Sequence, residues 1–316
     1  MFAEIDIEPS DWAIFVTAVL IFLALDLGVF HRKAHVVGFR EAFTWTAIWF
    51  TVAVCFGLFL APIFVEHWGK EEKAQFLTGY IIELSLSMDN VFVIALIFGY
   101  FRLGLQFQHR VLFWGILGAL LMRGLMIWLG AALISRFVWL IYVMGAFLVF
   151  TGIKMLATDE DDSVEPEKNF AIRLARKFFP ITKEFHDSKF IVKIDGRKLL
   201  TPLALVLLMV ETTDVIFAVD SIPAIFAVTQ DPFIVFTSNV FAILGLRSLY
   251  FVLAGAIDYF RFLKVGLSVV LVFIGAKMLI GHWFHIPTTF SLFVVAGIII
   301  ASIVVSMIVG RRVKKG

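Results

Sequence analysis

Long apolar stretches separated by short polar segments dominate the chain, and this pattern predicts its architecture. A helix needs roughly 20 apolar residues to cross the hydrocarbon core of a membrane, and nine stretches of the sequence meet that length. We therefore predict an all-α polytopic membrane protein with about nine transmembrane helices. The predicted spans lie near 12–30, 45–65, 75–100, 110–132, 136–157, 200–226, 232–256, 263–281 and 288–310.

The distribution of positive charge predicts the orientation of these helices. Most Lys and Arg residues fall in the loops after the first, third, fifth and seventh spans and in the tail 311–315, and basic loops stay cytoplasmic. We therefore expect the N-terminus outside and the C-terminus in the cytoplasm. The residues before the first span include no Lys or Arg, so they do not resemble the basic start of a signal peptide.

Composition narrows the class of protein further. The 316 residues are 61% hydrophobic and 16% charged, with a mean hydropathy of +0.96, which leaves no large soluble domain and no expectation of an enzyme. The net charge of +2 gives no reason to expect nucleic acid as a partner. Cys55 is the single cysteine in the sequence, so an intrachain disulfide framework and a thiolate metal site are both excluded.

One polar segment, 158–199, is much longer than the other loops. It begins with an acidic run at 159–162, which is typical of a solvated linker and could also bind cations loosely. Residues 170–179 follow with helical amphipathic spacing and a basic face, so we expect them to lie on the cytoplasmic membrane surface. This segment could also dock a cytoplasmic partner.

The sequence contains an internal repeat. Residues 149–156 match residues 272–279 in six of eight positions, residues 87–92 align with 212–217, and Arg123 falls in register with Arg247. Because the two copies enter the membrane from opposite sides, the repeats are predicted to be inverted, as in many secondary transporters. The predicted units are two helices in 1–74, a three-helix repeat in 75–157, a linker in 158–199, a second repeat in 200–281, and a last helix with the basic tail in 282–316.

Five acidic residues fall inside the third and sixth predicted spans, namely Glu83, Asp89, Glu211, Asp214 and Asp220. Each charge at the bilayer centre costs about 2.5 to 3.5 kcal/mol, so these groups must be paired, protonated or bound to a cation. One alternative is that they only neutralise the basic residues in the spans, which are Arg123, Arg247, Lys154 and Lys277. The acids outnumber these bases, and Asp26 near the end of the first span adds to the excess.

The side chains around these acids favour a hard cation. The candidate ligands are oxygens, from the carboxylates, Ser87, Asn90, Ser221, Asn239 and backbone carbonyls, and such oxygens suit Mn²⁺, Mg²⁺ or Ca²⁺. All seven His residues fall in loops or at span ends. Pro223 follows Asp220 closely and predicts a break in that helix, because proline removes one backbone hydrogen bond and clashes with the preceding turn.

At these residues the sequence resembles the TerC family of bacterial integral membrane proteins, and most closely its Alx branch. The similarity runs nearly from end to end and is carried by the segments 25–27, 83–92, 211–223 and 237–239. The resemblance implies a multi-pass protein of the bacterial inner membrane that exports Mn²⁺ through its intramembrane acids. It also implies an association with tellurium resistance and with metal supply to exported enzymes.

The residues and the resemblance lead to one working hypothesis. Asp89 and Asp214 hold Mn²⁺ during alternating access. The remaining groups have supporting roles: Glu83, Glu211, Asp220 and Asn90 complete the ligand shell or carry protons, while Arg123, Arg247 and Asp26 take part in charge pairing. Proton antiport is the expected coupling, because carboxylates removed from water can exchange a proton for a metal. No tightly bound cofactor is expected.

A second hypothesis comes from a different class of protein. The chain would then be a membrane scaffold that anchors a tellurium-stress or redox complex through the 158–199 segment and transports nothing itself. Such a scaffold gains nothing from five acids within the membrane. Deleting part of the segment separates the two hypotheses.

Overall fold

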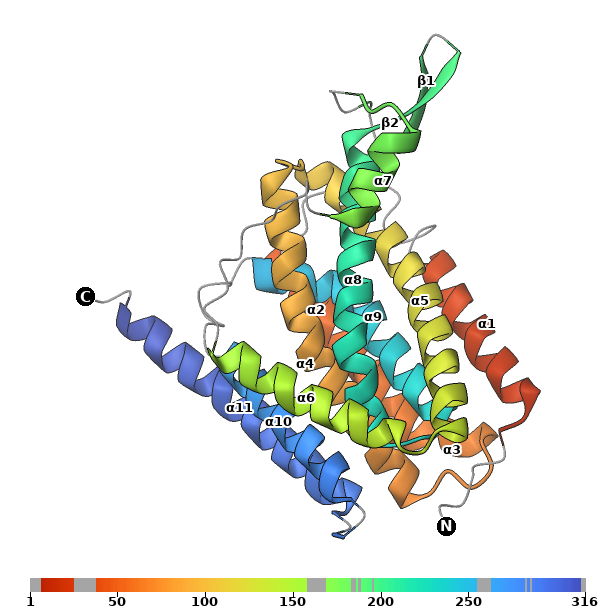
Figure 1. Ribbon diagram of the computed structural model, residues 1–316, viewed down its shortest axis with the longest axis vertical. Coiled ribbons are helices and arrows are strands. Elements are labelled where there is room, and N and C mark those ends of the chain that lie inside the picture. The colour runs from red at the N-terminus through yellow and green to blue at the C-terminus, as the bar shows by residue number, and fades with distance from the viewer. Residues whose placement is uncertain are drawn as a thin grey trace.

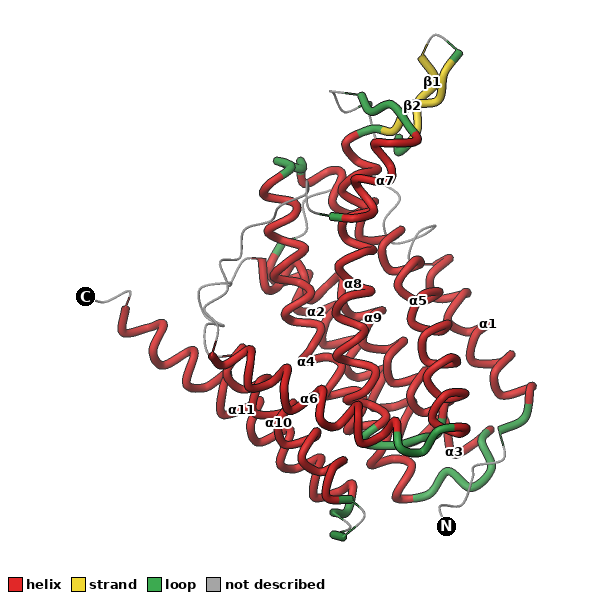
Figure 2. Tube along the Cα trace, viewed as in Figure 1, coloured by secondary structure: helices red, strands yellow, loops and turns green. Residues whose placement is uncertain are grey.

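The computed structural model describes residues 7–25, 38–157, 169–182, 186, 189–194, 196–254, 263–281, 283–284 and 286–313. Nearly all of this is helix, and one short hairpin stands at an end of the molecule (Figure 2). Seven of the described helices are long and apolar enough to cross a membrane, and the apolar helix Pro9–Leu23 is shorter. The prediction of an all-α polytopic membrane protein is confirmed, while the count of nine spans stays a prediction.

The elements follow the predicted spans closely. They are α1 Pro9–Leu25, α2 Phe39–Cys55, the π-helix η2 Phe56–Leu60, α3 Ala61–Phe64, α4 Lys70–Tyr100, α5 Leu105–Arg136, α6 Leu140–Ala157, α7 Phe170–Phe178, β1 Ile191–Ile194, β2 Arg197–Leu200, α8 Pro202–Phe226, α9 Pro232–Ala254, α10 Leu263–Ile280 and α11 Thr288–Val313. Apolar runs therefore located the helices, and only the ends moved by a few residues.

Four helices form the centre of the bundle. α4 packs on α9 and α8, and α5 packs on α8 and α9, so each helix of the first predicted repeat contacts helices of the second. α9 is the innermost, since 89% of its apolar stretch Pro232–Leu253 is buried. α2 covers α9 on one side, and α11 covers α4. Residues from these four central helices can therefore meet inside the protein.

α6 and α10 form a second packing unit through glycines. A methyl group built at Gly152 would lie 2.8 Å from the Ser268 carbonyl oxygen, and one at Gly275 would lie 2.6 Å from the Gly145 carbonyl oxygen. Only glycine allows backbones to approach this closely, which is a common way for helices to associate in membranes. We call Gly145, Gly152 and Gly275 the glycine seam.

The contacts across the glycine seam are reciprocal and antiparallel. Gly152 meets Ser268 and Val272, whereas Gly275 meets Gly145 and Val149. Gly152 and Gly275 are equivalent in the repeat, and so are their contact partners. This is the pattern expected of two elements related by a two-fold axis perpendicular to the helices. It agrees with the inverted repeat, whose full extent over 75–157 and 200–281 stays a prediction.

The predicted break at Pro223 is wrong. α8 is continuous through this residue to Phe226. Pro223 lies in the last turn, where only the bond to the Val219 carbonyl is lost. Its own carbonyl still accepts from the Ala227 amide at 3.0 Å. Burial of Ile222 and Ile225 against neighbouring helices keeps this turn in place.

An irregular turn occurs instead in α2, where the sequence did not predict one. The helix widens to a π-helix at Phe56–Leu60, just before Pro62. The indole Nε1 of Trp68 donates to the Gly57 carbonyl oxygen at 2.9 Å, which satisfies a backbone group in the widened turn. Gly57 also lies directly against the ring of Phe76, so a side chain has no room there.

The described part of the 169–200 segment packs against one end of α5 and α8 and stands at the top of Figure 1. The helix predicted at 170–179 forms as α7, and the side chain of its residue Ile172 is fully buried. β1 pairs antiparallel with β2, and Phe190 just before the hairpin packs edge-on to Trp114 at 6.4 Å between ring centroids. The acidic run at 159–162 lies outside the described residues.

Candidate ion site

Arg123 of α5 lies in the middle of the bundle and is only 2% exposed. Its Nη2 donates to Asp214 Oδ1 at 2.7 Å and its Nε donates to Asp214 Oδ2 at 3.1 Å, which makes a bidentate pair with α8. Its Nη1 forms an ion pair with Glu83 Oε1 of α4. One guanidinium therefore pairs with carboxylates from two helices that are far apart in the sequence.

Two amides complete this cluster. Asn90 Nδ2 donates to Asp214 Oδ1 at 3.3 Å, and Arg123 Nη1 donates to Asn239 Oδ1 of α9 at 3.4 Å. Both asparagines are buried. We call Glu83, Asn90, Arg123, Asp214 and Asn239 the charged centre, which draws on all four central helices.

Several polar atoms of the charged centre and of Ser87, one turn from Glu83 on α4, have no hydrogen-bond partner within the protein. They are Glu83 Oε2, Ser87 Oγ, Asn90 Oδ1 and Asn239 Nδ2. Glu83, Ser87 and Asn90 share one face of α4, because they are spaced by four and three residues. Buried polar atoms nearly always have a protein, water or ion partner. Three of the four are oxygens, so this surface is suited to a cation or to ordered water.

Glu211 and Asp220 lie on other faces of α8. The Glu211 carboxyl rests directly against Gly118 of α5, a glycine that gave no signal in the sequence. Asp220 accepts a hydrogen bond from Thr151 and lies near the charge of Lys154, both on α6. The described contacts therefore separate Asp220 from the charged centre and leave Glu211 one turn away from Asp214.

The other predicted site residues have different positions. Asp89 is partly buried and immediately precedes Asn90 on α4. Arg247 of α9 lines a small cavity together with Asn90 and Asp214, so both repeat-related arginines lie close to Asp214. Asp26 lies outside the described residues.

Two cavities lie on opposite sides of the charged centre. The small one, about 20 Å³, also contacts Leu112 and Val210 toward the α7 end and has room for one water molecule. The large one, about 1540 Å³, lies among the opposite helix ends and is lined by residues such as Glu71, Asp231 and Phe226.

An apolar layer separates the charged centre from the large cavity. Ile127 follows Arg123 along α5, and Ala218 and Ile222 follow Asp214 along α8. These three side chains are buried in one apolar cluster with Phe226. The distance along α8 from Asp214 to Phe226 is roughly 18 Å at 1.5 Å per residue. The site is thus closed on this side.

The charged centre offers oxygen ligands, although it is not a ready-made cluster of acids. Among the described residues, no group of three or more His, Cys, Asp and Glu side chains could hold a metal ion. The donor set consists of two carboxylates with amide and hydroxyl oxygens, which is suited to hard cations. With Arg123 in place the two carboxylates and one guanidinium carry a net charge of −1, so a cation must compete with that arginine.

The fold and this site define a multi-pass α-helical membrane protein with an ionised cluster buried among its spans. The chain belongs to the integral membrane protein TerC family, whose model matches residues 68–315. This confirms the family resemblance found in the sequence.

Similar proteins cover nearly the whole chain. "Uncharacterized membrane protein STKORF319" of Myxococcus xanthus is 54% identical over 306 residues, which cover 96% of this chain and 94% of that protein. "Putative membrane-bound redox modulator Alx" is 47% identical in Salmonella typhi and 46% identical in Escherichia coli K12, each over 309 residues covering 96% of both chains. No solved structure matches this chain.

Proposed function

We propose that this protein is a secondary transporter that exports Mn²⁺ across the bacterial inner membrane. The observation that carries the proposal is the charged centre, in which Arg123 is held between Glu83 and Asp214 deep in the bundle. A buried charge cluster is costly in a membrane. Such residues commonly mark the pathway of an ion.

The geometry supports an exchange between Arg123 and the transported cation. Without the cation, Arg123 pairs with both carboxylates. When a divalent cation enters, it takes the oxygens of Glu83 and Asp214 together with the unpartnered Oδ1 of Asn90 and Oγ of Ser87. Arg123 must then move or share these partners. This competition prevents the site from holding a cation so tightly that it cannot leave.

The ligand atoms support Mn²⁺ as the substrate. They are all oxygens, and the thioethers of Met88 and Met209 lie beside the acids in the sequence. Zn²⁺ and copper ions prefer nitrogen or sulfur ligands, and the described residues offer no cluster of His or Cys. Asp89 and Glu211, which flank the charged centre, are the groups proposed to complete the shell or to carry protons in antiport.

The test is uptake of Mn²⁺ into inverted membrane vesicles, with and without a pH gradient, and with Mg²⁺, Ca²⁺ and Zn²⁺ as competitors. We expect gradient-dependent accumulation that Asp214→Asn and Glu83→Gln abolish while the protein remains in the membrane. Glu66→Gln, at an exposed carboxyl outside the helices, is the matched control and should keep full uptake. Retained uptake in both site variants would refute the site assignment.

A scaffold function is the second candidate, and the printed name of the Alx relatives, redox modulator, favours it. The chain holds one cysteine, Cys55, so a dithiol reaction would need a partner or a bound redox group. Replacing the acidic run 159–162 by serines separates the two candidates. A transporter should keep Mn²⁺ uptake, whereas a scaffold should lose its ability to protect cells exposed to tellurite.

A further inference from the structure

α7 presents three different faces. Ile172 and Ala175 face the protein and pack in the apolar cluster at the start of α8. Phe170, Leu174 and Phe178 recur every four residues on a second face and are exposed by 72%, 43% and 67%. The exposed basic residues occupy the third face, at Arg173, Arg176 and Lys177. The second face is an apolar stripe that the protein itself does not cover.

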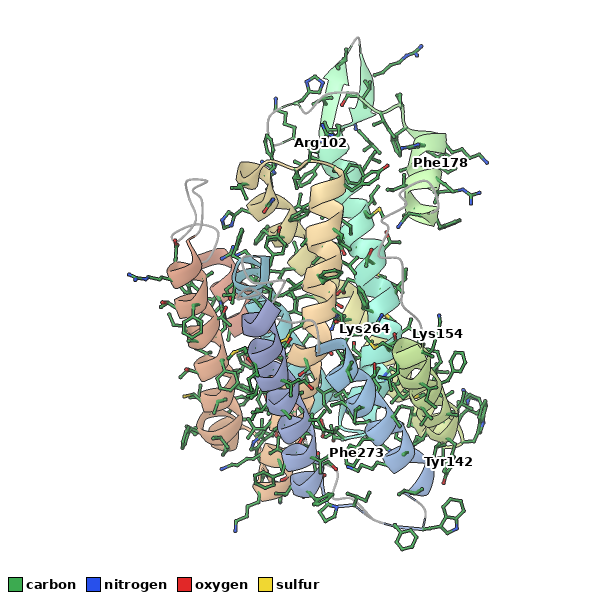
Figure 3. The ribbon with its side chains drawn as sticks, turned by 90° about the vertical axis from the view of Figure 1, so that its left-hand side faces the viewer. Arg102, Tyr142, Lys154, Phe178, Lys264 and Phe273 are labelled. Carbon is green, nitrogen blue, oxygen red and sulfur yellow. The ribbon has the colours of Figure 1, made fainter. Side chains whose placement is uncertain are left out.

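Two contacts place α7 alongside the first half of α8. At one end, Asn169 Nδ2 donates to Thr212 Oγ1 at 3.3 Å. At the other end, the Leu200 amide donates to the Pro180 carbonyl oxygen at 3.0 Å. α7 therefore runs antiparallel to α8, and its place at the cytoplasmic membrane surface stays a prediction. Figure 3 shows α7, with Phe178 labelled, at the edge of the bundle.

This position determines what can cover the apolar stripe. In a membrane spanned by α8, the end of α7 near Leu200 lies toward the lipid headgroups, and its start near Thr212 lies beside the acyl chains. Acyl chains can cover Phe170 and Leu174, while Arg173 and Lys177 on the adjoining face attract phosphate groups. Basic residues next to a spanning helix typically bind anionic lipid. Charge and depth together favour a lipid over a protein partner.

Asn169 connects this surface to the ion site. Its Oδ1 caps α7 by accepting from the amides of Ala171 and Ile172 at 3.0 and 3.2 Å. Its Nδ2 bonds to Thr212, which lies between Glu211 and Asp214 in the sequence. One side chain thus joins the start of α7 to the turn of α8 that carries the proposed site.

We propose that α7 binds an anionic phospholipid of the cytoplasmic leaflet and, through the Asn169 bond to Thr212, stabilises the site-bearing turn of α8. The binding part stands independently of what the protein transports. The regulatory part rests on the proposed transport function, because it predicts that anionic lipid changes the uptake of Mn²⁺.

The binding test compares the full chain in nanodiscs made with and without phosphatidylglycerol, with hydrogen exchange of residues 170–178 as the readout. Two basic residues near an anionic surface predict exchange at least about tenfold slower with the anionic lipid. Arg173→Gln with Lys177→Gln should remove this difference. Lys193→Gln with Lys198→Gln, which removes two exposed charges from the hairpin, is the matched control and should preserve it.

The coupling test uses Thr212→Val, which removes the bond to Asn169 and leaves the cap of α7 intact. In the wild type, phosphatidylglycerol should slow hydrogen exchange in α7 and in the first three turns of α8. In Thr212→Val we expect α7 to keep this effect and α8 to lose it. Mn²⁺ uptake should then no longer depend on the lipid. Equal exchange of α7 in both nanodiscs, or an unchanged response after the Arg173 and Lys177 substitutions, overturns the lipid site. An α8 response that survives Thr212→Val overturns the coupling.

Failure of the transport proposal would look different from failure of the lipid proposal. If Mn²⁺ uptake is absent under every condition, the exchange measurements still decide whether α7 binds the lipid. If uptake is present and depends equally on lipid in wild type and in Thr212→Val, the transport proposal stands and the coupling is refuted.

Discussion

The charged centre and the glycine seam hold helices together in opposite ways. At the charged centre, Arg123 joins α4, α5 and α8 through long side chains with several alternative partners. At the glycine seam, Gly152 and Gly275 bring α6 and α10 into backbone contact. Side-chain pairs can exchange partners without moving the backbone, whereas packed backbones cannot. The charged centre is thus suited to a changing occupant, and the glycine seam to a rigid unit.

The same comparison indicates which parts of the protein move in the proposed transport cycle and which stay together. α6 and α10 contact each other more extensively than they contact the four central helices, and they lie with α11 to one side of the bundle in Figure 1. The apolar layer that contains Ile127 and Ile222 separates the large cavity from the charged centre. In the proposed transport cycle, alternating access requires this layer to open while the glycine seam stays closed.

The largest predicted effect is at the charged centre. Arg123→Met leaves the buried carboxylates of Glu83 and Asp214 without a cation, and breaking such a pair costs about 3 to 5 kcal/mol. We expect a large drop in the midpoint of thermal unfolding in detergent. Adding Glu83→Gln and Asp214→Asn to the same chain should restore most of the stability. If Arg123→Met alone is as stable as the wild type, the ion pairs of Arg123 do not hold these helices together.

A smaller effect is expected at the glycine seam. Gly152→Ala and Gly275→Ala each force backbones apart, and overpacking of this kind costs about 1 to 3 kcal/mol. The same thermal unfolding measurement serves here.

Gly99→Ala and Gly297→Ala are matched controls for the seam, because a methyl group at either position meets nothing within 4 Å. These changes should be neutral or stabilise the helix by up to about 1 kcal/mol. If the seam variants behave like the controls, α6 and α10 are not held by close backbone contact.

The smallest effect on stability is expected at Gly118→Ala. The three atoms nearest to the added methyl group belong to the end of the Glu211 side chain, which can rotate away, so we expect a loss below about 1 kcal/mol. Mn²⁺ uptake should nevertheless change, because the carboxyl of Glu211 leaves its place one turn from Asp214. Unchanged uptake would show that Glu211 is not part of the proposed pathway, and Asp214 would then be the acid of α8 assigned to the ion.

The sequence predicted the helices and the candidate site residues, but it did not predict which residues of other helices these side chains contact. Hydropathy located the spans because a membrane imposes one length and one polarity on each of them. The break predicted at Pro223 was wrong, since its effect depends on its distance from the end of α8. Gly118 and Thr151 could not be identified as neighbours of Glu211 and Asp220, because nothing in the sequence reports which faces of two helices meet.

The sequence by itself determined an all-α membrane protein of the TerC family with costly acids and two repeat-related arginines within its spans. These features follow from local chemistry, since a charge inside an apolar run needs compensation wherever the run is placed. Only the tertiary structure decided that Arg123 pairs with Glu83 and Asp214, while Asp220 turns toward α6. Such choices depend on how helices distant in the sequence rotate and pack against one another.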